Sequence, residues 1–128
     1  MLARAFFISL LLVVSAPAHT PSRWLEVAGG AWHPPASSLA AVEAALKPLV
    51  ISKGGMDKPK WSDYTFQYQG RETPQGKKYI YINAFCDGGK RGNPEDWVSV
   101  FDGGACYFQG NYDPTSKRAY DVVVNGEA

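Results

Sequence analysis

From Trp61 to the C-terminus, apolar and polar residues alternate with a period of two, which is the pattern of half-buried β-strands. In residues 64–69 the aromatic side chains occupy one face, and Thr65, Gln67 and Gln69 occupy the other. The longest predicted strand, 77–86, places Ile80 and Ile82 on one face and Asn83 on the other. Further strands are expected at 97–101, 105–112 and 119–125, separated by turns and loops at 74–76, 87–96, 102–104 and 113–114.

A different repeat precedes these strands. Ser37 or Ser38 can cap a helix, and apolar residues then follow at helical spacing: Leu39, Val42, Leu46 and Leu49. Pro48 disfavours helical geometry at the residue before it, so the helix is expected to end or kink there. The pattern predicts one short amphipathic helix.

The helix and strands together define the expected fold class. Residues 19–35 contain three prolines and the Gly29–Gly30 pair, so they are predicted to form an irregular N-terminal arm, anchored by apolar residues such as Trp24 and Trp32. Residues 36–128 are predicted to be a single α+β domain. In it, one N-terminal helix packs on a four- to five-stranded antiparallel sheet with one disulfide.

The first eighteen residues have the layout of a secretory signal peptide. A basic start precedes the apolar run from Ala5 to Val14, and small residues follow at Ala16 and Ala18. The run is too short for a transmembrane helix, which needs about 20 apolar residues. We therefore expect residues 1–18 to be removed after Ala18, a periplasmic or secreted location, and no membrane insertion of the mature chain.

Charge narrows the class of partner. The chain has 13 basic and 12 acidic side chains, and Arg4 is the only charged residue in the leader, so the mature chain is balanced. Nucleic-acid binders normally show a basic excess or stripe. A nucleic-acid partner is therefore not expected.

The interpretation of the two cysteines, Cys86 and Cys106, depends on the predicted export. In an oxidising compartment an even cysteine count indicates a disulfide first. Zinc and redox sites are poor alternatives, because a second cysteine pair and a C-x-x-C spacing are both missing from the sequence. A bridge requires Cα atoms within about 7 Å. If it forms, residues 87–105 act mostly as a connection, and the Cys106 strand pairs directly with the Cys86 strand.

The sequence contains no catalytic or metal-binding motif, so we expect no enzymatic activity, metal or cofactor. His33 is the one candidate base in the body of the chain, and Asp63 or Glu95 would be its partner in a small hydrolase. A calcium site in the loop Asp87–Asp96 is conceivable, but the loop lacks the alternating oxygen ligands of an EF-hand. Aspartates in turns usually accept hydrogen bonds from backbone N–H groups, which explains most of the carboxylates without a functional role.

Aromatic residues are the remaining signal, because they fall on both faces of the predicted strands. One short helix covers one face, and the N-terminal arm can bury part of the excess. The alternatives are that all aromatics pack internally or that the rest form an exposed patch for a partner or ligand. The candidate binding surface comprises Tyr64, Tyr68, Tyr79, Tyr81, Trp97 and Tyr107.

Several segments resemble small exported bacterial proteins of unassigned function: Y-T-F-Q-Y-Q-G, Y-I-N-A-F-C, D-G-G-A-C-Y-F, Y-D-P-T and V-N-G-E-A. The resemblance covers about half the chain, and it implies a bacterial envelope location and pairing of Cys86 with Cys106. The order of helix and sheet also resembles cystatin-type folds. Because the inhibitory Q-x-V-x-G pattern of cystatins is missing, protease inhibition is not implied.

Three functional hypotheses follow. The first is an exported non-enzymatic binding domain, an inhibitor or immunity-type protein that acts on another envelope protein. The second is a binder of small ligands or glycans that uses the aromatic residues of the sheet. The third is the hydrolase built on His33. The sequence identifies neither the partner nor the oligomeric state.

Overall fold

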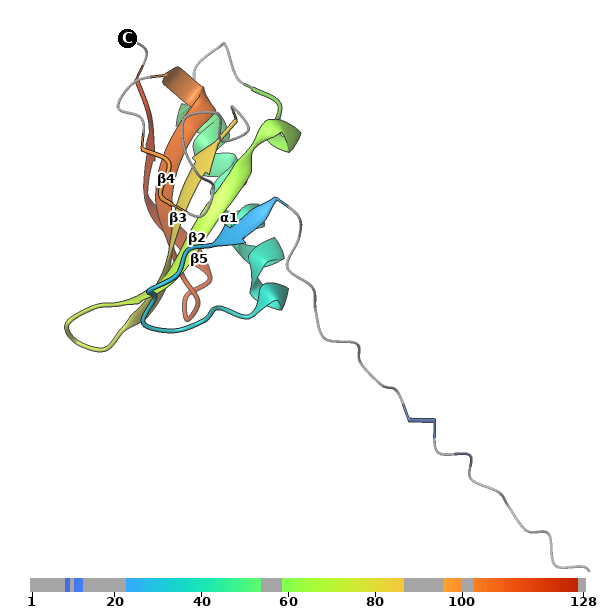
Figure 1. Ribbon diagram of the computed structural model, residues 1–128. Helices are drawn as coiled ribbons and strands as arrows, with labels where there is room; N and C mark the ends of the chain where they lie inside the picture. The colour runs from blue at the N-terminus through green and yellow to red at the C-terminus, as the bar shows by residue number, and fades with distance from the viewer. Residues whose placement is uncertain are drawn as a thin grey trace, which may run out of the picture.

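The computed structural model describes residues 9, 11–12, 23–53, 59–86, 96–99 and 103–126. Five strands form one sheet in the order β1-β2-β3-β4-β5 (Figure 1). Their bounds are β1 Trp24–Glu26, β2 Thr65–Glu72, β3 Lys78–Phe85, β4 Tyr107–Asp113 and β5 Arg118–Val124. The helix α1, Leu39–Lys53, lies behind the sheet in Figure 1. The predicted α+β class is confirmed. The sheet is mixed rather than wholly antiparallel, because β1 runs parallel to β2.

The first strand comes from the arm that was predicted to be irregular. Trp24 is buried and stacks on Phe66 of β2 with ring centroids 4.4 Å apart. The Val27 amide donates a hydrogen bond to the Tyr68 carbonyl oxygen at 2.9 Å. Burial of a tryptophan and pairing with the β2 backbone outweigh the glycine and proline content that argued for a loop. The expectation that Trp24 anchors the arm is confirmed.

Gly70 allows the arm to pass close to β2 beyond the β1 strand. Trp32 forms an isolated bridge with Gly70, and a Cβ atom at position 70 would overlap the Trp32 carbonyl oxygen. The Ala31 amide also donates to the Gly70 carbonyl oxygen at 2.8 Å. Position 70 therefore requires glycine because two backbones meet there.

The helix is longer than predicted. It runs through Pro48 to Lys53, and its buried side chains are Leu39, Val42, Leu46 and Val50. The expectation that the helix could end at Pro48 is wrong, because the chain stays helical beyond it. Pro48 lies on the exposed side, while Val50 in the last turn belongs to the core. Packing of that turn against the sheet outweighs the local cost of an interior proline, which is about 3 kcal/mol.

The core lies between α1 and the inner face of the sheet. It takes in the apolar faces predicted for the strands at 64–69 and 77–86, which both point toward the helix. Gly110 of β4 faces Leu46 of the helix, and a Cβ atom on Gly110 would lie 3.1 Å from a Leu46 methyl carbon. The absence of a side chain at Gly110 lets the helix pack closely on β4.

The last strand, β5, forms one edge of the sheet. Its pairing with β4 shifts register between Gln109 and Asn111, and Asp121 has a left-handed backbone with φ of 50°. The Lys53 ammonium at the end of α1 donates to the Val122 carbonyl oxygen at 2.8 Å. The helix end is thereby fixed to the edge strand.

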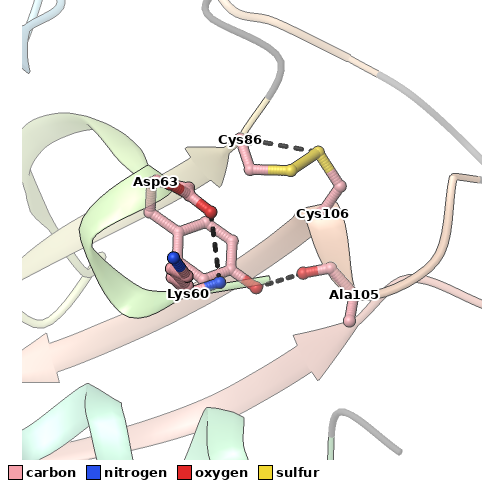
Figure 2. The surroundings of a disulfide bond; sticks show 6 residues. Lys60, Asp63, Cys86, Ala105 and Cys106 are labelled. Carbon is pink, nitrogen blue, oxygen red and sulfur yellow. Dashed lines mark hydrogen bonds between the residues drawn. A yellow bond between two sulfur atoms is a disulfide. The ribbon is translucent and has the colours of Figure 1, made fainter. Parts of the chain in front are cut away.

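The disulfide joins the end of β3 to the start of β4. Cys86 and Cys106 are bonded with Cα atoms 5.0 Å apart, and Figure 2 shows the bridge beside Ala105 and the Lys60–Asp63 turn. The neighbouring residues Phe85 and Tyr107 are register partners. The prediction that a bridge would force direct pairing of the two cysteine strands is confirmed.

A tyrosine hydroxyl supports the same end of the sheet. The Tyr64 hydroxyl donates a hydrogen bond to the Ala105 carbonyl oxygen, one residue before Cys106. Burial, followed by the nearby Asp63 charge, raises the pKa of Tyr64 to about 12. The phenol therefore stays protonated at neutral pH and remains a donor.

The predicted strand at 97–101 is wrong for its described part, because residues 97–99 adopt no strand pairing. Val98 instead lies across the outer face of the sheet, the face opposite α1, and packs with Phe85 and Tyr107. Its backbone groups bond to side chains of the sheet rather than to a neighbouring strand. Within the described residues, no helix has the length and apolar character needed to cross a membrane.

Candidate functional site

A row of amide side chains crosses the outer face of the sheet. Strand alternation places Gln67 of β2, Asn83 of β3 and Gln109 of β4 on this face, and the register aligns them as direct cross-strand partners. Gln67 is fully buried and Asn83 is 5% exposed. Buried amides are costly unless their polar atoms are hydrogen-bonded. The hydrogen-bond partners of these amides therefore show which part of the chain the row holds in place.

The amide row holds the segment 96–99 against the sheet. Gln67 Oε1 accepts from Asn83 Nδ2 and from the Val98 amide, each at 2.9 Å, and Gln67 Nε2 donates to the Asp96 carbonyl oxygen. Asn83 Nδ2 also donates to the Val98 carbonyl oxygen at 2.7 Å. Two side chains thus satisfy three backbone groups of the crossing segment and fix its position.

An arginine–aromatic cluster lies beside this row. The Arg71 guanidinium carbon is 4.0 Å from the ring centroid of Tyr81 and 5.4 Å from that of Trp97. The two aromatic rings meet edge to face with centroids 5.2 Å apart. Arg71 Nε donates to Gln69 Oε1 at 2.9 Å. Stacking and this hydrogen bond together orient the guanidinium plane.

The charge of Arg71 has no counter-ion among the residues that the structure describes. Its hydrogen bond goes to the neutral Gln69, and its ring contacts are with Tyr81 and Trp97. Burial raises the pKa of Tyr81 above its usual value, and the Arg71 charge acts in the opposite direction. Tyr81 is therefore a neutral phenol at neutral pH, and Arg71 supplies the positive charge of the cluster.

These groups line a cleft of about 420 Å³, a volume within the usual range for ligand sites. The lining residues combine amides, one cation, two aromatic rings, an aliphatic side chain and a hydroxyl: Arg71, Tyr81, Asn83, Trp97, Val98, Ser99, Gln109 and Asn125. This described lining includes no carboxylate, histidine or cysteine. The arrangement is suited to holding a polar or anionic molecule by hydrogen bonds and ring contacts.

The six residues of the predicted binding surface do not form one surface. Tyr64 and Tyr68 belong to the core under α1, and Tyr107 is buried against Phe85 and Val98. Tyr79 is partly buried on β3 and is not among the residues that line the cleft. The two that line it are Tyr81 and Trp97.

Sequence reasoning missed the polar half of the site. Arg71 and Gln109 were not singled out, although Gln67, Gln69 and Arg71 alternate along one face. A solvent-facing strand usually carries charged residues or threonine, so repeated amides opposite an aromatic strand were a usable signal. The register of the β2–β3 hairpin pairs Arg71 with Tyr79 and Gln69 with Tyr81, so it places Arg71 beside the tyrosines of β3.

The hydrolase set is not assembled in the described residues. The His33 side chain is 84% exposed and contacts Glu26, with Nδ1 2.5 Å from Oε1. Asp63 instead accepts from the Lys60 amide at 3.2 Å within a short turn. Glu95, the other proposed partner, lies outside the described residues. The structure therefore pairs His33 with Glu26 and not with Asp63.

The acidic residues of the turns and of the loop considered for calcium have different outcomes. Asp113 caps a turn as expected, because its Oδ1 accepts from the Thr115 amide at 2.9 Å. The loop 87–96, considered for calcium, lies outside the described residues apart from Asp96. Within the described residues, no group of three or more His, Cys, Asp or Glu side chains is placed to hold a metal ion.

Comparisons with protein-family models, with curated proteins and with solved structures gave no match. The resemblances drawn from the sequence therefore stay predictions. What bears on function is the fold, a helix on a five-stranded sheet, and the cleft on its outer face.

Proposed function

We propose that this protein is an exported, non-enzymatic binding domain that holds a small polar ligand or a segment of a glycan in the outer-face cleft. The observation that carries the proposal is the oriented Arg71–Tyr81–Trp97 cluster beside the amide row. Side chains held in place before binding lose little freedom when a ligand arrives, which favours recognition. The described lining offers donors, acceptors and ring faces rather than an acid–base pair.

Export is the second part of the proposal. It is supported by the leader pattern in residues 1–18 and by the disulfide, which is typical of oxidising compartments. Leu11 and Leu12, within the apolar run of the leader, are 86% and 81% exposed, so they contribute nothing to the core.

Protein recovered from the envelope of a bacterial host is expected to begin at His19 by intact-mass measurement. A mass that retains Met1 would contradict removal of the leader.

Ligand binding is expected to be visible at one tryptophan. When the protein is titrated with bacterial cell-wall fragments, the indole N–H signal of Trp97 in an NMR spectrum should shift, because Trp97 lines the cleft. The signal of Trp24, buried on the other side of the sheet, should not move. Gln109→Ala should weaken binding about threefold to tenfold through loss of a lining amide. Tyr120→Ala, an exposed change outside the lining, should leave it within twofold.

A protein partner in the cell envelope, bound by an inhibitor or immunity-type protein, is the second candidate function. It is favoured by the edge strand β5, where Val123 is 58% exposed and Tyr120 is 38% exposed. Exposed apolar side chains of this kind are suited to a protein interface. Capture of an envelope protein that is lost in Val123→Asp and retained in Trp97→Ala would favour this candidate over the cleft ligand.

A further inference from the structure

We infer that the ligand of the outer-face cleft is an acidic saccharide, whose carboxylate pairs with Arg71 while its hydroxyls bond to the lining amides. This inference rests on the proposed binding function and adds the chemical class of the ligand. It follows from three features of the site: the orientation of Arg71, the charge of the lining, and the identity of the other polar groups.

Arg71 lines the cleft, and two contacts restrain its guanidinium group. Arg71 Nε is occupied by Gln69 Oε1, and the guanidinium plane is held over the Tyr81 ring. The two terminal nitrogens have no hydrogen-bond partner among the described residues. Terminal N–H groups in this arrangement match the two oxygens of one carboxylate. Because the side chain is already restrained, binding such a group costs little additional entropy.

The charge of the lining favours an anion. Arg71 is the one charged side chain among the described lining residues. A partly buried cation gains more from a counter-ion than an exposed one, because water screens the interaction less. A neutral ligand would leave this charge without a counter-ion as it displaced water from the cleft.

The remaining lining groups favour a hydroxylated body over a simple anion or an apolar acid. Gln109 and Ser99 offer both donors and acceptors, Asn83 contributes its Oδ1 acceptor, and Trp97 offers an aromatic surface. An apolar acid would displace water from the Gln109 amide without offering it a hydrogen-bond partner. An inorganic ion would leave most of a cleft of about 420 Å³ unfilled. A sugar ring provides hydroxyls for the amides and C–H faces for the indole.

The test compares acidic saccharides with their neutral methyl esters by isothermal titration calorimetry. Trigalacturonic acid represents uronic acids of exopolysaccharides, and the disaccharide N-acetylglucosaminyl-N-acetylmuramic acid represents the cell wall. We expect at least one of these acids to bind about tenfold or more tightly than its methyl ester, and the affinity to fall with added salt. The acid that binds identifies the source of the ligand.

Variants locate the charge effect at one residue. Arg71→Gln should abolish the preference for the acid, and Arg71→Lys should retain a reduced preference, since the charge stays but the bidentate geometry is lost. Arg118→Gln, which removes an exposed cation at the start of β5, is the matched control and should bind the acid within twofold of the unmodified protein. Circular dichroism and melting temperature verify that each variant is folded. Should Arg71→Gln be unfolded, Arg71→Lys and the acid–ester comparison decide the matter.

The outcomes separate this inference from the function beneath it. Equal binding of acid and ester, with Trp97 responding to both, overturns the acidic ligand and leaves a neutral glycan binder. An acid preference that persists in Arg71→Gln also overturns the inference, because the charge is then recognised elsewhere. Absence of binding by both saccharides and both esters, with the Trp97 signal unmoved, contradicts the inference and the proposed cleft function together.

Discussion

Replacing Gln67 with alanine is expected to destabilise the protein by about 2–5 kcal/mol and to release the segment 96–99 from the sheet. Gln67 is fully buried, and its amide satisfies the Val98 amide, the Asp96 carbonyl oxygen and Asn83 Nδ2. Alanine removes these partners and leaves a small cavity. Each polar group left buried and unbonded costs about 1–3 kcal/mol, which exceeds the gain from removing the amide itself.

Two measurements check this result. Urea denaturation gives the change in the free energy of unfolding, and hydrogen exchange reports whether the Val98 amide loses protection. Gln109→Ala is the matched control. It lies in the same amide row, but it is partly exposed and its hydrogen bond to Asn83 Oδ1 is 3.3 Å long, so a loss below about 1 kcal/mol is expected. Equal losses in the two variants, with Val98 still protected, would show that Gln67 does not hold the segment.

Removing the disulfide is expected to cost about 3 kcal/mol. The bridge closes a loop of 20 residues between Cys86 and Cys106, and the chain-entropy model gives this magnitude for a loop of that size. The double variant Cys86→Ala, Cys106→Ala should therefore melt roughly 12–24 °C below the oxidised protein, by the usual conversion for a domain of about 100 residues. The strand pairing of Phe85 with Tyr107 should persist in the folded state.

Chemical reduction provides the control for this prediction. A thiol reductant should lower the melting temperature of the unmodified protein by a similar amount and should leave the double variant unchanged. If the reduced and oxidised forms melt together, the bridge adds nothing to stability. The pairing of β3 with β4 would then be sufficient by itself to hold that end of the sheet.

Much of the fold was predictable because it is recorded in local periodicity. The alternation in residues 64–69 and 77–86 gave β2 and β3, and the cysteine spacing correctly placed β4 beside β3. The parallel strand β1 was missed, because three residues are too few for a periodic signal. Its pairing depends on Trp24 stacking on Phe66, 42 positions away in the sequence.

The candidate site was less predictable for a geometric reason. Alternation shows which residues of one strand share a face, but it does not show which faces of two strands coincide or what covers them. Tyr64 and Tyr81 were therefore grouped together, although the first belongs to the core under the helix and the second lines the cleft. Trp97 reaches the cleft because two distant amides bind its neighbours in the chain. The periodicity of residues 97–101 gave no indication of that contact.

The termination of the sheet at β5 has a consequence for association. An open edge strand can recruit a strand from another chain, which leads to aggregation or to recognition by strand addition. Here the Val122 carbonyl oxygen already accepts a hydrogen bond from the Lys53 ammonium. The register shift between β4 and β5 and the left-handed backbone of Asp121 also distort the edge. The opposite edge, β1, is only three residues long. Both borders thus resist extension by a further strand, so contacts through side chains are favoured over strand addition at either edge.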